Sequence, residues 1–147
     1  EHLAMAAQLL EERGGVIIDR SSLYETEPWG KTDQDPFLNQ ALILETPLTA
    51  RELMQEVIAI ETQMGRHRIE KYGPRVIDID ILLFNHQVID EHGLCIPHPE
   101  LPNRRFVLEP LNQLAPAYIH PILYKTIQQL LEECSDPLSV KKIIYNV

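Results

Sequence analysis

Two aspartates, Asp78 and Asp80, stand one residue apart inside the apolar run 76–84, which is rich in Ile, Val and Leu. Such a run predicts a buried strand, yet a buried charge costs several kcal/mol unless it is paired or binds a metal. Because side chains alternate between the two faces of a strand, both carboxylates point to the same side, about 7 Å apart. One or two divalent cations would relieve their repulsion, so the run predicts a metal site. The structural alternative is a pair of capped or salt-bridged aspartates.

The ten residues before this run form a basic segment. It holds four cationic side chains, which are Arg66, Arg68, Lys71 and Arg75. Carboxylates that hold metal next to cations that hold phosphate indicate a nucleotide–Mg²⁺ site. The basic residues alone could also form a solvated charged face, an alternative that the neighbouring aspartates make much less favourable.

Composition narrows the class of protein. The 147 residues suffice for one domain with a sizeable core, so we expect a single domain over 1–147. The formal net charge of −9 argues against a nucleic-acid or membrane-surface binder. No run is long enough to span a membrane and no signal peptide is visible, so we expect a cytoplasmic protein and favour a monomer. Cys95 and Cys134 lack metal-binding spacing and are expected to be free, buried thiols.

Hydrophobic periodicity and turn residues predict the order of helices and strands. In chain order we expect a helix over 2–13, strands over 16–26 and 37–46 with a long loop between them, a helix over 49–65, the strand 76–84, a turn at 85–86, a short strand at 87–89, and helices within 103–115 and over 126–133. Capping boxes open two of these helices, at Thr49 with Glu52 and at Thr126 with Gln129. The order predicts an α+β fold, a ferredoxin-like βαββαβ sandwich with extra C-terminal helices whose first strand is missing.

The segment 73–82, which reads GPRVIDIDIL, resembles the signature of the 6-hydroxymethyl-7,8-dihydropterin pyrophosphokinase family of folate biosynthesis. Further segments match in order, and the resemblance covers nearly the whole chain. The resemblance implies Mg²⁺-dependent transfer of a diphosphate from ATP to the hydroxymethyl group of the pterin, leaving AMP. Members of the family normally begin with a strand, so we expect either a trimmed N-terminus, a strand supplied by a partner or swapped copy, or a defective fragment.

The resemblance also assigns roles to the metal-binding and ATP-binding positions. It implies that Asp78 and Asp80 hold two Mg²⁺ ions, and we favour Asp80 as the group that accepts the substrate proton. The positions implied to bind ATP or its phosphates are Glu61, Arg66, Arg68, Lys71, Tyr72, Arg75, His98 and Arg104, of which Lys71 and Arg75 are also expected to act in catalysis. Arginine suits this task because its planar fork donates two parallel bonds to phosphate. The basic residues of the loop could each be a solvent-exposed charge instead, Arg66 most of all, and a surface histidine is the less favoured interpretation of His98.

The pterin positions are implied in the same way. Phe37 and Phe106 match the two rings that sandwich the pterin, although core packing would explain either ring without the resemblance. Asn39 can donate and accept along the pterin edge. Thr26 and Trp29 match positions whose backbone lines the pocket.

Two other interpretations stay open. A nucleotidyltransferase or glycosyltransferase with the same DxD motif would release pyrophosphate or a nucleoside diphosphate instead of AMP. A non-catalytic ferredoxin-like ligand-binding module would have no reason to place two aspartates on one face of a buried strand beside a basic loop. Asp78→Ala would leave such a module functional, whereas it should abolish Mg²⁺-dependent turnover in the pyrophosphokinase.

Overall fold

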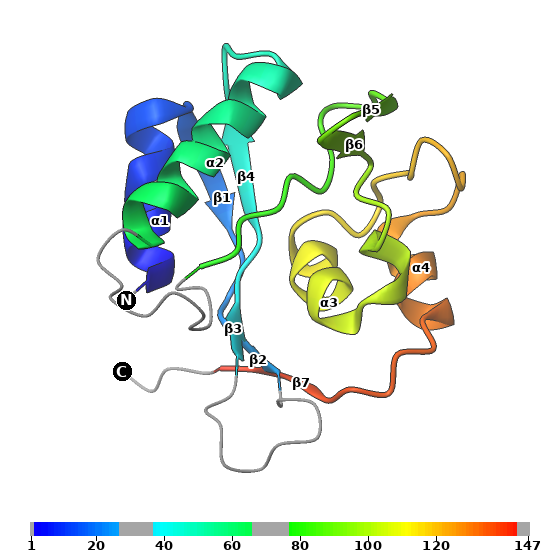
Figure 1. Ribbon diagram of the computed structural model, residues 1–147. Helices are drawn as coiled ribbons and strands as arrows, with labels where there is room; N and C mark the ends of the chain where they lie inside the picture. The colour runs from blue at the N-terminus through cyan, green and yellow to red at the C-terminus, as the bar shows by residue number, and fades with distance from the viewer. Residues whose placement is uncertain (1, 27–36, 66–76, 144–147) are drawn as a thin grey trace.

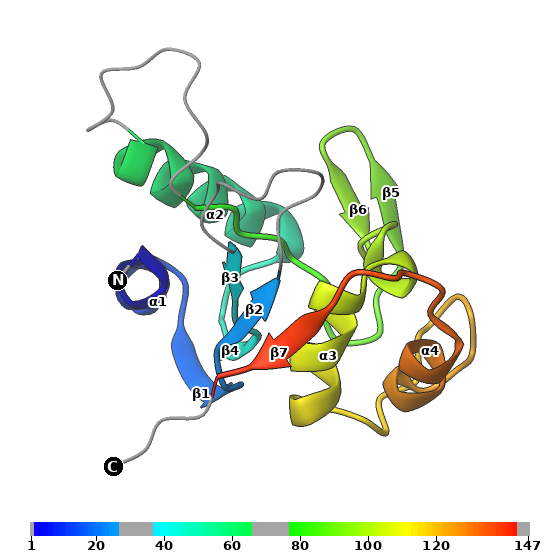
Figure 2. The ribbon, with the colours of Figure 1, turned by 90° about the horizontal axis from the view of Figure 1, so that it is seen from below.

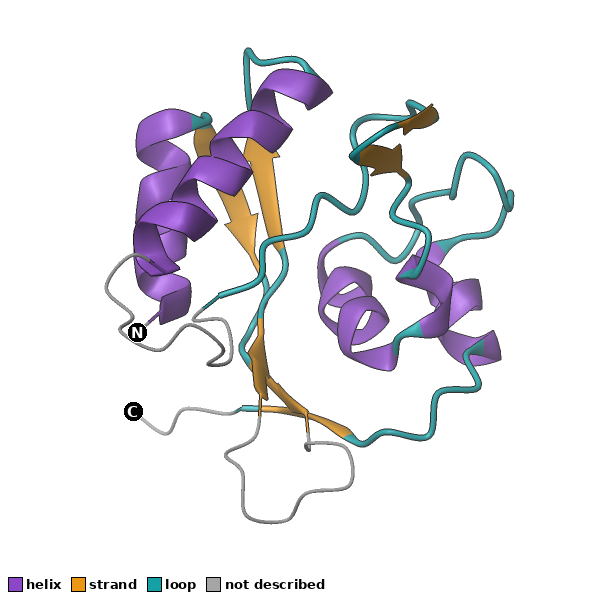
Figure 3. Ribbon diagram, in the orientation of Figure 1, coloured by secondary structure: helices purple, strands orange, loops and turns teal. Residues whose placement is uncertain are grey.

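The computed structural model describes residues 2–26, 37–65 and 77–143 as a mixed α+β fold (Figure 1; Figure 3). Its elements are, in order, α1 (His2–Arg13), β1 (Val16–Arg20), β2 (Tyr24–Thr26), β3 (Phe37–Asn39), β4 (Leu42–Glu45), α2 (Ala50–Gly65), β5 (Ile89–Glu91), β6 (Leu94–Ile96), the 3₁₀ helix η1 (Leu101–Asn103), α3 (Arg105–Leu114), α4 (Ile127–Glu133) and β7 (Val140–Lys142). Within these ranges the strands form three small antiparallel sheets, ordered β1–β4, β3–β2–β7 and β5–β6.

Each of the two long strands expected near the N-terminus is divided in two. The pairing runs from Arg20 with Leu42 to Tyr24 with Asn39, so three residues on one side (21–23) face two on the other (40–41). The extra residue is accommodated as in a β-bulge. The Ser21 amide donates to the Ala41 carbonyl at 2.9 Å, and the Ala41 amide donates to Ser21 Oγ at 2.8 Å. A side chain thus replaces one link of the ladder and bends both strands.

Helices α1 and α2 pack together over one face of the β1–β4 pair (Figure 1). The helix bounds agree with the periodicity, and the expected capping box is present, because the Glu52 amide donates to Thr49 Oγ1 and the Thr49 amide donates to Glu52 Oε1. We call the apolar core beneath these helices the first cluster. Its buried members are Ala6, Leu10, Ala50, Leu53, Val57, Ile60, Met64, Ile81, Leu94 and Ile96.

A second cluster joins η1, α3 and α4. Its buried members are Leu101, Leu108, Leu111, Ile127 and Leu130. The second capping box is also confirmed, because Gln129 and Thr126 exchange side-chain to backbone bonds at the start of α4. In Figure 1 the segment that follows residue 76 runs between helices α1 and α2 on one side and helices α3 and α4 on the other.

That segment, residues 77–84, is not the strand that its sequence predicts. It is extended, but within the described ranges it belongs to no β-ladder. The apolar pattern is satisfied by packing alone: Ile77, Ile79 and Phe84 pack against the first cluster, whereas Leu82 and Leu83 pack against the second. Backbone groups bond elsewhere, since the Leu82 carbonyl accepts from the His98 amide at 2.9 Å. Hydrophobic burial therefore fixes the segment without strand pairing.

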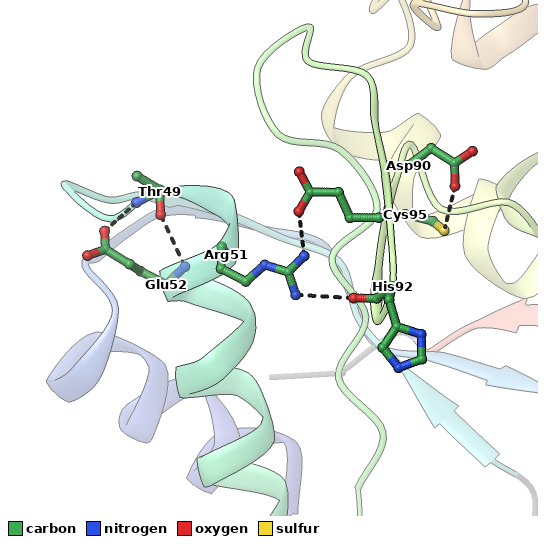
Figure 4. A network of polar contacts seen from close by, with 7 residues as sticks. Thr49, Arg51, Glu52, Asp90, His92 and Cys95 are labelled. Atoms are coloured by element: carbon green, nitrogen blue, oxygen red, sulfur yellow. Dashed lines mark hydrogen bonds and ion pairs between the residues drawn. The ribbon is translucent and has the colours of Figure 1, made fainter.

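The hairpin β5–β6 replaces the short strand expected at 87–89. Gly93 lies in its turn with φ of +79°, a conformation that favours glycine. Figure 4 shows how the hairpin is tied to α2: the Arg51 guanidinium donates to the His92 carbonyl at 3.2 Å and pairs with Glu91. Cys95 and Cys134 are free, as expected, but Cys95 is exposed on this hairpin, where its thiol contacts Asp90, so its predicted burial is wrong.

The C-terminal part of the described chain returns to the sheet. Strand β7 pairs with β2 on the side away from β3 (Figure 2). Arg105, at the start of α3, anchors the connection by donating to the carbonyls of Asp136 at 3.2 Å and Cys134 at 3.0 Å. Strand β7 was not among the elements predicted from the sequence. Among the described helices, none combines the length and the apolar character that a membrane crossing requires.

Candidate active site

Asp78 and Asp80 are both exposed, while Ile77, Ile79 and Ile81 alternate with them and pack inward. The alternation expected of a strand therefore holds even though no ladder forms, and it puts both carboxylates on the solvent side. In residues 2–26, 37–65 and 77–143 no third His, Cys, Asp or Glu completes a group able to hold a metal. Two carboxylates with room for water and phosphate oxygens are a donor set that suits Mg²⁺.

His98 lies beside the second aspartate. Its Nε2 is 3.8 Å from Asp80 Oδ1, and its side chain is 25% exposed. Its Nδ1 accepts from the Glu100 amide at 3.2 Å, so in the neutral ring the proton resides on Nε2. The structure thus brings together two residues that the sequence analysis singled out separately, and it points a nitrogen donor at the carboxylate face.

Glu61 approaches the same segment from α2. Its Oε2 accepts from the Ile79 amide at 2.8 Å, and the bond is partly buried. Ile79 is the residue between the two aspartates, so a carboxylate expected to contact ATP touches the backbone of the candidate metal site.

Three of the expected pterin residues meet at the junction of β2 and β3. Thr26 is buried and pairs with Phe37 across the ladder. The Asn39 side-chain amide donates to Thr26 Oγ1 at 2.9 Å, which fixes its orientation. Phe37 is 57% exposed and is therefore not a core residue. An aromatic ring left in solvent beside an oriented amide is the chemistry that a flat heterocycle needs.

Phe106 and Arg104 sit at the beginning of α3, which packs against β2 and β3. The Arg104 guanidinium lies over the Phe106 ring, 5.8 Å from its centroid, a cation–π contact. The remaining predicted site residues lie outside the described ranges. They are Trp29, Arg66, Arg68, Lys71, Tyr72 and Arg75.

One supporting residue was missed. Gln113 on α3 accepts from the Tyr24 hydroxyl at 2.8 Å and from the Ser22 amide at 3.0 Å, and so ties α3 to β2. Burial, followed by the negative charge of Glu109, raises the pKa of Tyr24 above its usual value of 10.0, which keeps it a hydrogen-bond donor. No local sequence pattern indicates this contact, because Tyr24 and Gln113 lie 89 positions apart in the chain.

Comparisons with known proteins bear directly on this site. Residues 1–116 match the family described as 7,8-dihydro-6-hydroxymethylpterin-pyrophosphokinase. This chain belongs to that family. It is therefore a pyrophosphokinase, an enzyme rather than a binding module, and the family's substrates are ATP and the hydroxymethyldihydropterin.

Individual relatives agree with the family match. A 2-amino-4-hydroxy-6-hydroxymethyldihydropteridine pyrophosphokinase of Methylorubrum extorquens is 38% identical over 142 residues, which cover 96% of this chain and 88% of that protein. The enzyme of the same name from Bacillus subtilis is 42% identical over 114 residues, covering 77% of this chain and 68% of that protein. The folic acid synthesis protein fol1 of Schizosaccharomyces pombe is 38% identical over 90% of this chain, which spans 18% of that protein.

Proposed function

We propose that this pyrophosphokinase transfers the β,γ-diphosphate of ATP to the hydroxymethyl oxygen of 6-hydroxymethyl-7,8-dihydropterin in folate biosynthesis. The hydroxymethyl oxygen forms a bond to the β-phosphorus, the bond from that phosphorus to the α–β bridging oxygen breaks, and AMP leaves. The observation that carries this proposal is the exposed pair Asp78 and Asp80, with His98 3.8 Å from the second carboxylate, in a chain of this family.

Asp78 and Asp80 would hold two Mg²⁺ ions. When bound, such ions neutralise the charge that develops on the entering and leaving oxygens. The exposure of both carboxylates supports this assignment, because it leaves room for phosphate oxygens to complete the coordination. The hydroxyl proton passes to a carboxylate of the pair, and Asp80 is our candidate acceptor.

Cationic side chains would bind the triphosphate. Arg66, Arg68, Lys71 and Arg75 are proposed to clamp its oxygens, with Lys71 and Arg75 acting at the transferred group. His98 would donate its Nε2 proton to a phosphate oxygen next to Asp80. Arg104 and Tyr72 are proposed to contact the nucleotide.

The pterin would stack between Phe37 and Phe106. The exposure of Phe37 and the packing of α3 against β3 support this placement. Asn39 would pair with the pterin edge through the side-chain oxygen that its bond to Thr26 leaves available. Trp29 is proposed to line the same pocket.

At the level of the whole molecule we propose a ferredoxin-like arrangement in one domain spanning 1–147, acting as a cytoplasmic monomer. The element order α1, β1–β2, β3–β4, α2 and the extended segment 77–84 supports that arrangement.

An assay with ATP, Mg²⁺ and the pterin tests the function, with adenine nucleotides separated by chromatography. We expect AMP to form only when the pterin is present, together with equimolar pterin diphosphate. Asp78→Asn and Asp80→Asn should each lose at least about 10²-fold in rate, whereas Asp90→Asn, on the exposed hairpin, should match the parent. ADP or free pyrophosphate as the product would contradict the proposal.

A further inference from the structure

We propose that Glu61 is a positioning residue, which holds the peptide unit between Asp78 and Asp80 and so sets the direction of both carboxylates. The inference rests on the proposed function, because it concerns the same pair of aspartates. It assigns Glu61 a task that needs a hydrogen-bond acceptor at this position.

The geometry of the contact is the first step. Glu61 Oε2 accepts from the Ile79 amide at 2.8 Å. Consecutive Cα atoms are about 3.8 Å apart, so Ile79 lies one peptide unit from each aspartate. A displacement of the Ile79 amide would therefore move the attachment points of both carboxylates together.

The surroundings make this bond important to the segment. Residues 77–84 join no β-ladder within the described ranges, so a side chain takes the place that a neighbouring strand would fill. Metal-binding carboxylates depend on the groups that orient them, and loss of such a group typically costs about 10- to 100-fold in metal affinity.

The part of α2 that carries Glu61 is held in place by the core. Glu61 follows Ile60, which is fully buried in the first cluster, and Met64 anchors the next turn of α2. The Ile79 side chain packs against the same cluster. Both ends of the bond are thus fixed by one apolar core, which is what a positioning contact requires.

Substitutions at position 61 can test whether the segment needs a hydrogen-bond acceptor there. Within the described ranges Glu61 and the two aspartates form no group of three able to hold a metal. A glutamine at position 61 keeps an oxygen that can accept from the Ile79 amide and removes the charge. A leucine removes both and keeps a similar volume.

The test compares Glu61→Gln and Glu61→Leu with Glu56→Gln and Glu56→Leu, since Glu56 lies on the exposed side of the same helix, where it pairs with Arg13. We measure the Mg²⁺ concentration that gives half-maximal rate, the KM for the pterin, and the hydrogen exchange of the Ile79 amide. Glu61→Leu should raise the Mg²⁺ requirement by about 10- to 100-fold and speed exchange at Ile79, with the pterin KM unchanged. Glu61→Gln should keep the exchange of the Ile79 amide as slow as in the parent, and both Glu56 variants should resemble the parent in all three measurements.

Two results would overturn the proposal. If the Ile79 amide exchanges as fast in Glu61→Gln as in Glu61→Leu, an acceptor oxygen at position 61 does not hold the segment. If exchange at Ile79 is the same in all variants, the bond does not hold the segment. The exchange measurement needs no turnover, so it decides the proposal even if the parent forms no pterin-dependent AMP, a result that would contradict the proposed function alone.

Discussion

Both the backbone and the side chain of His98 form hydrogen bonds at the candidate site. Its amide donates to the Leu82 carbonyl, its carbonyl accepts from the Leu101 amide, and its Nδ1 accepts from the Glu100 amide. Only Nε2 faces Asp80. The two ring nitrogens therefore have different tasks, one in holding the turn and one toward the candidate phosphate site.

Two isosteric substitutions should separate these tasks. His98→Gln retains a donor near Nε2, whereas His98→Asn retains an acceptor near Nδ1. We expect kcat/KM for ATP to fall by about 10²-fold in His98→Asn, as for loss of a transition-state donor, and by clearly less in His98→Gln. Steady-state kinetics measure this, and unfolding in urea should rank the two variants the other way. Equal kinetics in both variants would exclude a role for the Nε2 donor.

A second histidine, His120, should make the free energy of unfolding depend on pH. His120 is buried, and its Nδ1 accepts from the amides of Ile122 and Leu123, each at 3.1 Å. Burial lowers the pKa of His120 below its usual value of 6.5. Because the pKa of His120 is lower in the folded protein, the unfolded chain binds the proton more readily. The contribution of His120 to the free energy of unfolding is therefore complete above pH 6.5, and it is lost as the pH falls from there through the pKa of the folded state.

We therefore expect the free energy of unfolding to decrease between pH 7.5 and pH 5 in the parent and to decrease less in His120→Asn, which keeps an acceptor and does not titrate. Urea unfolding at several pH values measures the difference. His86→Asn is the control, because His86 lies exposed against Tyr118 with its ring stacked at 4.9 Å. An identical pH dependence in the parent and His120→Asn would show that another group controls stability in this range.

At the scale of elements, the turn from α1 into β1 leaves no room for a side chain at Gly15. A Cβ at Gly15 would lie 2.0 Å from the Glu45 carbonyl oxygen, a backbone atom of β4 that cannot move aside without opening the β1–β4 pair. A Cβ at Gly65, at the end of α2, would meet nothing within 4 Å. The two glycines thus offer opposite tests of the same substitution.

Gly15→Ala should lower the free energy of unfolding by at least about 1–3 kcal/mol, the usual cost of overpacking. Gly65→Ala should leave it unchanged or raise it by up to about 1 kcal/mol, since alanine is the better helix former. Thermal unfolding followed by circular dichroism measures both. Comparable stability of the two variants would mean that the β1–β4 pair is not held in this register.

At the scale of the whole molecule, residues 77–84 join the two apolar clusters, with Ile79 packed on one and Leu82 on the other. Ile60→Ala in the first cluster and Leu108→Ala in the second should each cost about 2–5 kcal/mol. Because the clusters share this segment, we expect one common unfolding transition in both variants. Hydrogen exchange of the α2 and α4 amides at a series of urea concentrations shows whether the two helices unfold together. Different urea midpoints for the two helices would mean that residues 77–84 do not couple the clusters.

The sequence predicted local structure better than pairing. Helix bounds, both capping boxes and the alternation around Asp78 follow from periodicity and short-range chemistry, and the structure confirms them. The bulge at Ser21 and strand β7 depend on contacts between distant segments, which no local pattern encodes, whereas the β5–β6 hairpin is a local turn that was expected only as a single short strand. At the site, the motif predicts the residue types, but the contacts of Glu61 with Ile79 and of His98 with Asp80 arise from folding and follow from no sequence motif.

The position of Asp78 and Asp80 on the segment shared by both clusters also has an evolutionary consequence. Substitutions at Ile79 or Leu82 would alter the packing of this segment against the two clusters and, at the same time, the orientation of the two carboxylates. Natural selection therefore cannot change the stability of the fold and the catalytic rate independently along these eight residues. Lineages that adapt this enzyme to a new temperature should accept changes elsewhere, in the outer faces of the helices or in the β5–β6 hairpin, before they change this segment.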